Sequence, residues 1–435
     1  MYDLAVIGAG WAGFNAALEA KKYGLKVALI EKDKIGGICL NRGCIPTKAL
    51  IQSAKVYSLS QKSAKFGIEI TDSKINLPEI QKRKEAIVGQ LGKGIEFMLR
   101  DIRLLKGEAR FSSNEELIIG EDKVKAKHII IASGSRPLQL PDLKFDGKKI
   151  VSSDDILNLN VIPESLLIIG GGIIGCEFAS LFSILGTDVT IVELMPHILP
   201  QEDKEIAKRL EGIFKKRGIK IYVNTDVRTM NLEEYELALQ CVGRAPELEG
   251  LDLNKAGVQT QKFKLASAKI ITDEHMNTTV PNIFAAGDCA GGKQLAHAAA
   301  YQGRIAAKNI ARSSRLKQID SRLIPNCIFT MPEVASVGIT EQETKENGIE
   351  PKINKFDFLG SGMARIMDEA EGFIKIVSDK NTGDILGASI IGPKATELIA
   401  IITVAIQSHL KLSQLRSIVF AHPTLSESIQ EATKE

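Results

Sequence analysis

Apolar and polar positions follow one another along the chain in blocks that predict strands and helices in turn. The apolar run from Leu4 to Ile7 predicts a buried strand, and the glycine-rich GAGWAG after it opens a helix that continues to about Tyr23. A second strand is predicted from Lys26 to Ile30 and ends at Glu31. Short apolar runs joined through a glycine turn and a helix are typical of a parallel β–α–β unit.

The same pattern returns in the middle of the chain. A strand is predicted from Ser165 to Ile169, followed by GGGIIG, a helix, and a strand from Asp188 to Val192 that ends at Glu193. Both units therefore have glycines spaced G-x-G-x-x-G between a strand and a helix, which is the context of a dinucleotide-binding loop. These glycines are Gly8, Gly10 and Gly13, then Gly170, Gly172 and Gly175.

Two such units predict two bound nucleotides. The carboxylates of Glu31 and Glu193 can each accept hydrogen bonds from ribose hydroxyls. In the second unit an acidic residue favours NAD over NADP, and residues 194–197 include no arginine that could hold a 2′-phosphate.

Beyond these units, a helix is predicted from Glu79 to Arg100, and strand-like pieces follow it as far as HIIIASGSRP. A short strand is predicted from 219 to 224 and another from 237 to 241. A later apolar strand ends at Asp288, where a carboxylate can bind ligand hydroxyls or cap the next helix. From about residue 319 the pattern changes to strands alternating with amphipathic helices, such as FIKIVSD and ILGASIIG. This predicts an α+β domain.

Composition narrows the range of partners. The 435 residues are 44% hydrophobic and 25% charged with a net charge of +3, which gives no reason to expect nucleic acid or an anionic membrane. We see no signal peptide before the first strand, and the longest apolar helical run, Glu397 to Gln407, is too short to span a bilayer. We therefore expect a cytoplasmic protein.

Two of the six cysteines, Cys39 and Cys44, lie close together in GGICLNRGCIPTKAL. A zinc site would need a second pair of ligands, and the sequence offers none at suitable spacing. A structural disulfide across so short a loop would stabilise the fold by roughly 2 kcal/mol at best, and a reducing cytosol would erode it. A redox disulfide agrees best with the context, because a helix start near Cys44 and the neighbouring Lys48 both favour a thiolate. We expect small buried hydrophobic roles for Cys176, Cys241, Cys289 and Cys327.

The C-terminal AHPTLSE allows two interpretations. Thr424 as N-cap and Glu427 at the third helical position fit a capping box, with Pro423 at its start. That explanation leaves His422 without a role. A histidine held by a carboxylate is also what a thiol-activating base needs, since the carboxylate stabilises the imidazolium.

Together these motifs resemble the flavoprotein disulfide reductases, from residue 2 to about residue 432. The resemblance rests on GAGWAG, GGICLNRGCIPTKAL, GGGIIGCEFA, VGRAPE, AAGDCAG with LAHAA, MPEVASVG and AHPTLSE. It implies an α/β fold with two Rossmann-like domains, for FAD at 1–145 and for NAD at 146–269. A return segment at 270–318 would complete the FAD domain, and an α+β dimerisation domain would occupy 319–435.

The resemblance also implies roles for individual residues, with no metal. The catalytic set would be Cys39, Cys44, Lys48, Glu177, His422 and Glu427. Tightly bound FAD would be held by Gly8, Gly10, Gly13, Glu31, Lys48, Ala109, Gly134, Asp288 and Ala296. NAD would be held by Gly170, Gly172, Gly175, Glu193, Val227 and Gly243.

The implied enzyme is a homodimer in which His422 and Glu427 of one subunit reach the disulfide of the partner subunit. Its substrate would be dihydrolipoamide on a separate lipoyl-bearing protein. The alternatives are a glutathione-reductase-like enzyme and a non-catalytic FAD/NAD redox sensor. The sequence leaves open which lipoyl-dependent complex it serves, the net direction and the flavin potential.

The chain departs from the family pattern at two places. Phe420 stands where the family often has a second histidine. The β-meander expected between the strands at 219–224 and 237–241 is shortened, and Val227 lies at the edge of this gap. Because both glycine loops lie outside the gap, we expect NAD binding to survive.

Overall fold

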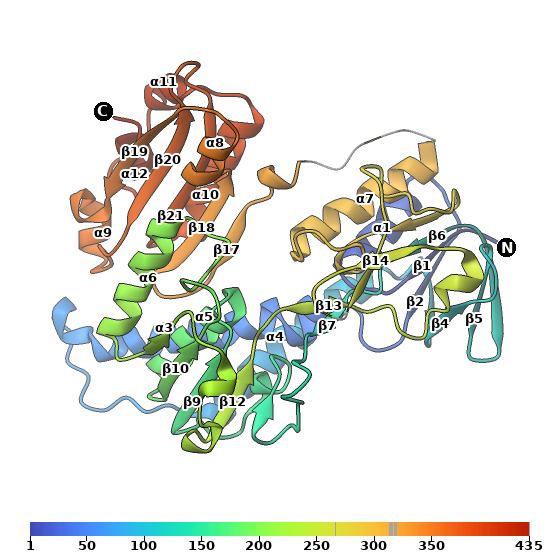
Figure 1. The fold of residues 1–435 in the computed structure, drawn as a ribbon, viewed down its shortest axis with the longest axis horizontal. Coiled ribbons are helices and arrows are strands. Elements are labelled where there is room, and N and C mark those ends of the chain that lie inside the picture. The colour runs from blue at the N-terminus through green and yellow to red at the C-terminus, as the bar shows by residue number, and fades with distance from the viewer. Residues whose placement is uncertain (266, 313–315, 317–319, 435) are drawn as a thin grey trace.

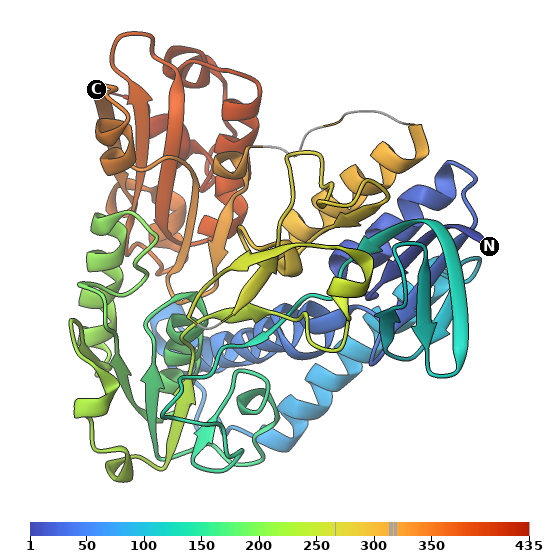
Figure 2. The same ribbon diagram turned by 45° about the vertical axis from the view of Figure 1, so that its right-hand side comes forward.

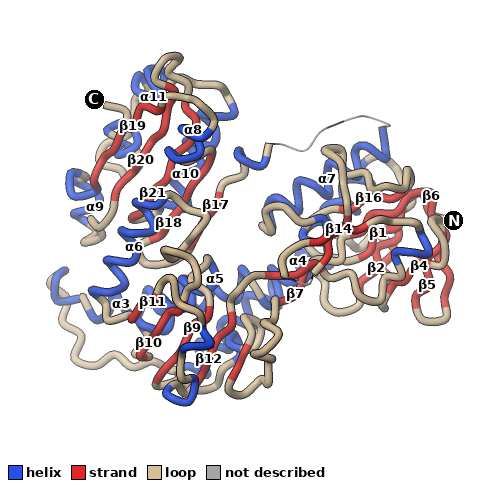
Figure 3. The backbone as a smooth tube through the Cα atoms, viewed as in Figure 1, coloured by secondary structure: helices blue, strands red, loops and turns tan. Residues whose placement is uncertain are grey.

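The computed structural model describes residues 1–265, 267–312, 316 and 320–434. It contains three large sheets, which lie in separate parts of the molecule (Figures 1 and 3), and two two-stranded sheets. The sheet of the middle region is parallel, the sheet near the N-terminus contains both parallel and antiparallel pairs, and the C-terminal sheet is antiparallel. The expected α/β fold with a C-terminal α+β domain is therefore confirmed.

The first sheet has β1 (Tyr2–Ile7) at its centre, between β2 (Val27–Glu31) and β6 (Asp122–Ile131). β16 (Ile283–Ala285) returns from much later in the chain and pairs in parallel with β6. α1 (Trp11–Lys22) packs along α7 (Ala296–Arg312), so the return segment covers the same nucleotide loop. The remaining strands of this sheet are β3 (Arg103–Lys106), β4 (Ala109–Phe111) and β5 (Glu116–Ile119).

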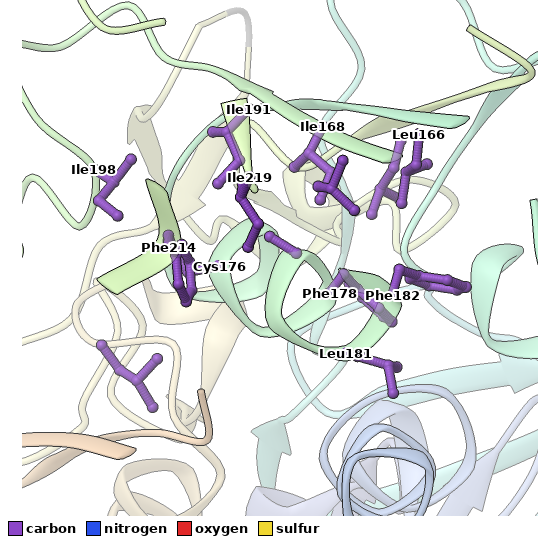
Figure 4. Packing of buried hydrophobic residues seen from close by; sticks show 14 of the residues in the cluster. Leu166, Ile168, Cys176, Phe178, Leu181, Phe182, Ile191, Ile198, Phe214 and Ile219 are labelled. Carbon is purple, nitrogen blue, oxygen red and sulfur yellow. The ribbon is translucent and has the colours of Figure 1, made fainter. Parts of the chain in front are cut away.

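The second sheet has the order β11-β10-β9-β12-β8, and all its pairs are parallel. Its strands are β8 (Ile150–Val151), β9 (Ser165–Ile169), β10 (Asp188–Val192), β11 (Lys220–Tyr222) and β12 (Leu237–Gln240). α5 (Ile173–Ile184) and α6 (Lys204–Lys216) cover it, and Phe178, Phe182 and Phe214 pack beneath its strands (Figure 4). Between β11 and β12 the chain, described throughout, forms only 3₁₀ turns at Val227–Thr229 and Leu232–Glu234, so the meander is shortened as expected.

The segment that follows β12 does not pack in the domain to which the expected limits assign it. The other expected domain limits remain predictions. β13 (Arg244–Pro246) pairs with β7 (Ser135–Pro137), and β14 (Thr260–Lys262) forms a hairpin with β15 (Ala268–Ile270). Leu251 and Val258 are buried in the core of the first sheet, although residues up to 269 were expected in the NAD domain. The physical reason is that their apolar faces find a partner only on the first sheet. The expected limit between 318 and 319 lies outside the described residues.

The C-terminal sheet has the order β17-β18-β21-β20-β19, and α10 (Ala395–Gln407) packs against β18 and β21. Its strands are β17 (Asn326–Ile328), β18 (Glu333–Gly338), β19 (Pro351–Asp357), β20 (Phe373–Asp379) and β21 (Ile385–Gly392). The short helices are α8 (Glu341–Glu346), α9 (Gly362–Ile366), α11 (Leu412–Ser417) and α12 (Glu427–Glu431). The chain's own sequence FIKIVSD forms β20 and ILGASIIG forms β21, as their patterns predicted.

Three helices connect the first and second sheets. α2 (Gly37–Arg42) leads into the long α3 (Cys44–Gln61), and α4 (Leu77–Met98) packs alongside α3 (Figure 2). α3 also contacts α5 of the second unit. The start of α3 is thereby held between the two nucleotide loops. Within the described part of the chain, no helix combines the length and apolarity needed to cross a membrane.

Candidate active site

One cavity of about 1980 Å³ lies where the three parts of the chain meet. Gly10 and Trp11 of the first glycine loop line it on one side, and Gly170 and Gly172 of the second loop line it on another. Cys39, Cys44, Lys48, Glu177 and residues of β17 face the same space. The cavity thus joins both predicted nucleotide loops to the cysteine pair.

The two glycine loops have the same close-packed geometry. A Cβ on Gly13 would lie 1.7 Å from the carbonyl oxygen of Gly8, and a Cβ on Gly175 would lie 2.0 Å from that of Gly170. Gly8 and Gly170 adopt φ values of +97° and +102°, which residues with side chains rarely adopt. A side chain at any of these positions would strike the backbone and break the tight turn, so both loops fit a dinucleotide-binding turn.

Glu31 and Glu193 also hold matching positions. Each carboxylate accepts one N–H from the glycine loop at 2.7 Å and a second N–H from the residue two positions further on, at 2.8 Å and 2.7 Å respectively. Burial raises the pKa of Glu31. The donors are Ala9 and Asp33 for Glu31, and Gly171 and Met195 for Glu193. Each glutamate thereby fixes its loop against the end of the second strand, where a ribose would lie.

Most of the other predicted nucleotide ligands face the cavity. Its described lining includes Gly134, Asp288 and Ala296 on the FAD side, and Val227 and Gly243 on the NAD side. Val227 thus lines the cavity despite the shortened segment, and its contact with NAD remains a prediction.

Ala109 does not line this cavity. It is 3% exposed in β4 and packs with the core of the first sheet, because alternate residues of that strand point inward. The position of the Ala109 side chain therefore does not support the predicted contact with FAD.

The cysteines form a close pair of free thiols. Cys39 lies within α2 and Cys44 begins α3. A hydrogen bond from Cys39, aided by the charge of Lys48, lowers the pKa of Cys44 to about 7. The same interaction and burial raise the pKa of Cys39. The geometry therefore favours a thiolate at Cys44 and a thiol at Cys39 when the pair is reduced.

Lys48 and Glu177, both expected in the catalytic set, join α3 to α5. Lys48 Nζ lies 2.9 Å and 2.8 Å from the two carboxylate oxygens of Glu177, which is 3% exposed. The backbone N–H of Phe329, just after β17, donates to the same carboxylate at 2.9 Å, and its ring lies 4.8 Å from Lys48 Nζ. Phe329 was missed because its role depends on how the third sheet docks; only its position ahead of MPEVASVG could have indicated it.

His422 and Glu427 form the expected pair, with His422 Nδ1 2.8 Å from Glu427 Oε2. The other carboxylate oxygen accepts the N–H of Thr424 at 3.3 Å, and the Thr424 hydroxyl accepts the N–H of Glu427 at 3.3 Å. The capping-box bonds therefore form, but α12 begins at Glu427 with Ser426 as its N-cap, so the expected helix start at Thr424 is wrong. The reason is that the 424–426 turn holds the Glu427 carboxylate beside His422 and is not itself helical.

The His422 side chain is 78% exposed, and neither it nor Glu427 lines the cavity formed by the described residues. One chain therefore does not bring this pair to its own Cys39. Phe420 packs against the core of the C-terminal sheet and leaves His422 without a second histidine beside it.

Several cavity residues were not found from the sequence. Arg228 reaches the NAD side from the shortened segment, where Asp226 holds it at 3.0 Å. Arg244 donates to the hydroxyl of Ser135 at 2.9 Å. Cys241 and Cys327 line the cavity and are partly exposed, so of the four single cysteines only Cys176 and Cys289 are buried as expected. A long side chain that crosses between units leaves no local periodicity to detect.

Comparisons with known proteins agree with this geometry. Residues 2–303 match the family model described as pyridine nucleotide-disulphide oxidoreductase, and residues 324–433 match the dimerisation domain of that family. The chain is 39% identical to a dihydrolipoyl dehydrogenase of Bacillus subtilis (strain 168), covering 99% of this chain and 97% of that protein. It is 42% identical to one of Chlamydia pneumoniae, covering 98% and 95%.

Solved structures show the same fold. LpdA from Mycobacterium tuberculosis has a TM-score of 0.90 at 28% identity, covering 99% of this chain and 98% of that one. The HOCl-induced flavoprotein disulfide reductase RclA from Escherichia coli has a TM-score of 0.88 at 29% identity, covering 99% of both chains.

Proposed function

This chain belongs to the pyridine nucleotide-disulphide oxidoreductase family, and from that premise we propose that it oxidises protein-bound dihydrolipoamide to lipoamide with NAD. As a family member it is a flavoprotein that uses FAD and NAD. The observation that carries the proposal is the cysteine pair, in which a thiolate-forming Cys44 lies beside the Lys48–Glu177 pair between two dinucleotide loops. The full-length similarity to dihydrolipoyl dehydrogenases supports the choice of substrate.

In the first step His422 takes a proton from one thiol of dihydrolipoamide, and Glu427 stabilises the imidazolium that forms. The substrate thiolate attacks Cys39 of the oxidised Cys39–Cys44 disulfide. A substrate–Cys39 disulfide forms, the Cys39–Cys44 bond breaks, and Cys44 leaves as a thiolate. Its lowered pKa makes Cys44 the better leaving group of the two.

In the second step the other substrate thiol gives its proton to water, displaces Cys39 and closes the lipoamide disulfide. The proton held by His422 returns to Cys39, whose raised pKa favours the thiol. The protein has then gained two electrons and holds a Cys39 thiol and a Cys44 thiolate. Lys48 stabilises this negative charge. The loop of Gly8, Gly10 and Gly13 would hold FAD, which when bound would supply the electron acceptor between this dithiol and NAD.

We also propose that each active site is shared between two copies of the chain. The exposed His422–Glu427 pair and its absence from the cavity of its own chain support this, as does the match to a dimerisation domain. NAD is preferred over NADP because the buried Glu193 would repel a 2′-phosphate. A cytoplasmic location belongs to the same proposal, since the pair must cycle through free thiols.

The function is tested by comparing two activities of the purified holoprotein. We expect NAD reduction by dihydrolipoamide, little with NADP, and no NADPH-driven reduction of glutathione disulfide. The C44S variant should bind FAD and lose thiol oxidation. Activity confined to the glutathione assay, or undiminished turnover in C44S, would overturn the proposal.

Site sharing is tested by co-expressing C44S and H422Q chains. Each variant alone should be inactive, whereas a mixed dimer regains one complete site of its two. If the mixed dimer stays inactive while retaining FAD, the pair acts within one chain or not at all.

A further inference from the structure

The short helix α2 connects the first nucleotide loop to the cysteine pair. The N–H of Gly36 donates to the carbonyl of Ala9 at 2.9 Å, and a Cβ on Gly37 would lie 2.7 Å from the Cα of Gly10. The start of α2 is therefore seated directly on the glycine loop. Its last residue is Arg42, two positions before Cys44.

Arg42 places a positive charge beside the ribose-binding carboxylate. Its guanidinium forms an ion pair with Asp33, whose N–H donates to Glu31 at 2.8 Å. Arg42 also lines the cavity together with Gly10 and Trp11 of the loop. The charge therefore lies between the ribose end of the site and the turn that receives a pyrophosphate.

The ion pair with Asp33 is easily exchanged. The two side chains are 44% and 45% exposed, and a pair so open to water contributes little to stability. Other cations on this side of the cavity are occupied by buried partners, Lys48 by Glu177 and Arg244 by Ser135. A guanidinium binds phosphate oxygens through two parallel hydrogen bonds, so a pyrophosphate is the stronger partner for Arg42.

We propose that Arg42 is a pyrophosphate-binding residue for FAD and that its guanidinium exchanges Asp33 for the pyrophosphate when the cofactor binds. The inference rests on FAD as the cofactor and does not depend on dihydrolipoamide as the substrate. It gives the segment between Cys39 and Cys44 a second role: the helix that carries the attacked sulfur also retains the flavin.

Binding of FAD to the full-length apoprotein tests the proposal without any turnover. Trp11, the single tryptophan of the chain, lines the cavity, so quenching of its fluorescence reports FAD binding directly. ADP and adenosine then serve as competing probes, because only ADP carries the pyrophosphate. The variants are R42Q, R42K, D33N and the matched control K32Q, which removes a nearby charge that pairs with Glu108 at 3.2 Å.

We expect R42Q to weaken the binding of FAD and of ADP about tenfold to a hundredfold and to leave adenosine unchanged, as for the loss of a charged hydrogen bond. The FAD affinity of R42K should lie between those of wild type and R42Q, because lysine keeps the positive charge but lacks the two parallel N–H donors of the guanidinium. D33N should bind FAD as well as wild type or better, and K32Q should stay within about threefold of it.

Three results would overturn the proposal. Wild-type FAD affinity in R42Q would mean that the guanidinium does not contact the cofactor. An equal loss in D33N would mean that the Arg42–Asp33 pair acts only as a structural support. A matching loss of adenosine affinity would place Arg42 away from the pyrophosphate. Circular dichroism of each apoprotein identifies any variant that fails to fold. If R42Q fails to fold, R42K is compared with wild type in its place.

Discussion

Lys375 of β20 is the cation whose removal should most weaken the docking of the second unit onto the C-terminal sheet. Its side chain is 3% exposed, and Nζ lies 2.9 Å from Asp203, 2.7 Å from Glu205 and 2.9 Å from Glu341. Asp203 caps α6 and Glu205 lies in its first turn, so the cluster ties that helix to the third sheet. We predict that Lys375→Met lowers stability far more than the loss of an exposed lysine.

The size of the stability loss depends on which of the three carboxylates keep another ion-pair partner when Lys375 is removed. Glu205 retains Lys355 at 2.6 Å, and Glu341 retains Lys345 at 2.6 Å. Asp203, 5% exposed, has no other ion-pair partner among the described residues. Leaving one buried charge unpaired costs about 3–5 kcal/mol. At about 2–4 °C per kcal/mol for a unit of 150–250 residues, the midpoint of thermal unfolding should fall by roughly 6 °C or more.

The pH dependence gives a second measure. Hydrogen bonds from Lys345 and Lys375 lower the pKa of Glu341 to about 2, and the three carboxylates raise the pKa of Lys375. The lowered pKa contributes stability that is fully present above the ordinary glutamate value and is lost as the pH falls toward 2. The raised pKa of Lys375 contributes stability that is fully present below the ordinary pKa of a lysine. Both contributions to stability are therefore present at pH 7. The difference in unfolding midpoint between wild type and K375M should become smaller below about pH 4.5.

The assay is unfolding followed by circular dichroism and flavin fluorescence at one fixed protein concentration, with midpoints compared because a chain of several units need not unfold in two states. K355M is the matched control; its lysine is 43% exposed and should cost no more than about 1 kcal/mol. K375M/D203N should recover most of the loss, since asparagine also caps a helix and carries no charge. Equal midpoints for K375M and K355M, or no recovery in the double variant, would refute the reasoning.

Three further predictions concern the site itself. Gly13→Ala should yield protein without visible flavin absorbance, because its Cβ would lie 1.7 Å from the Gly8 oxygen, whereas Gly89→Ala, with nothing within 4 Å, should keep FAD. Cys39→Ala should raise the pKa of Cys44 above its present value of about 7, since the hydrogen bond from Cys39 is the largest cause of the shift; the ultraviolet absorbance of the thiolate against pH measures this, and an unchanged titration would contradict it. Glu427→Gln should reduce kcat about 10²-fold with FAD content unchanged, because the His422 imidazolium loses its carboxylate; a wild-type kcat would show that Glu427 does not act through His422.

Much of the fold could be predicted because its signals are local. The strands Ser165–Ile169 and Asp188–Val192 begin and end as their apolar runs predicted, since both are buried on two faces and bounded by polar or glycine residues. Both glycine loops were also predictable, because the tight turn admits no side chain. The start of α12 was not, since Thr424 and Glu427 make the bonds of a capping box in either conformation.

What the sequence left open depends on contacts between units. Arg228 comes from a segment where the family pattern is interrupted, and Phe329 reaches Glu177 only because the third sheet docks on α5. The position of residues 244–269 depends on which sheet offers an apolar surface to Leu251 and Val258. None of these contacts leaves a period or a spacing in one sequence, because each depends on the relative placement of two separately folded parts.

The Lys48–Glu177 pair shows why the redox centre lies where the units join. Glu177 is 3% exposed, and a carboxylate that deep in the protein must be paired if the fold is to tolerate it. Lys48 provides that charge from α3, one turn after Cys44, and the N–H of Phe329 provides a further hydrogen bond from the third part of the chain. The contact that lets α5 pack against α3 is thus the same contact that holds a positive charge near the Cys44 thiolate. A substitution that removed the redox function of Lys48 would leave Glu177 buried without its cation, so stability and catalysis constrain this pair together.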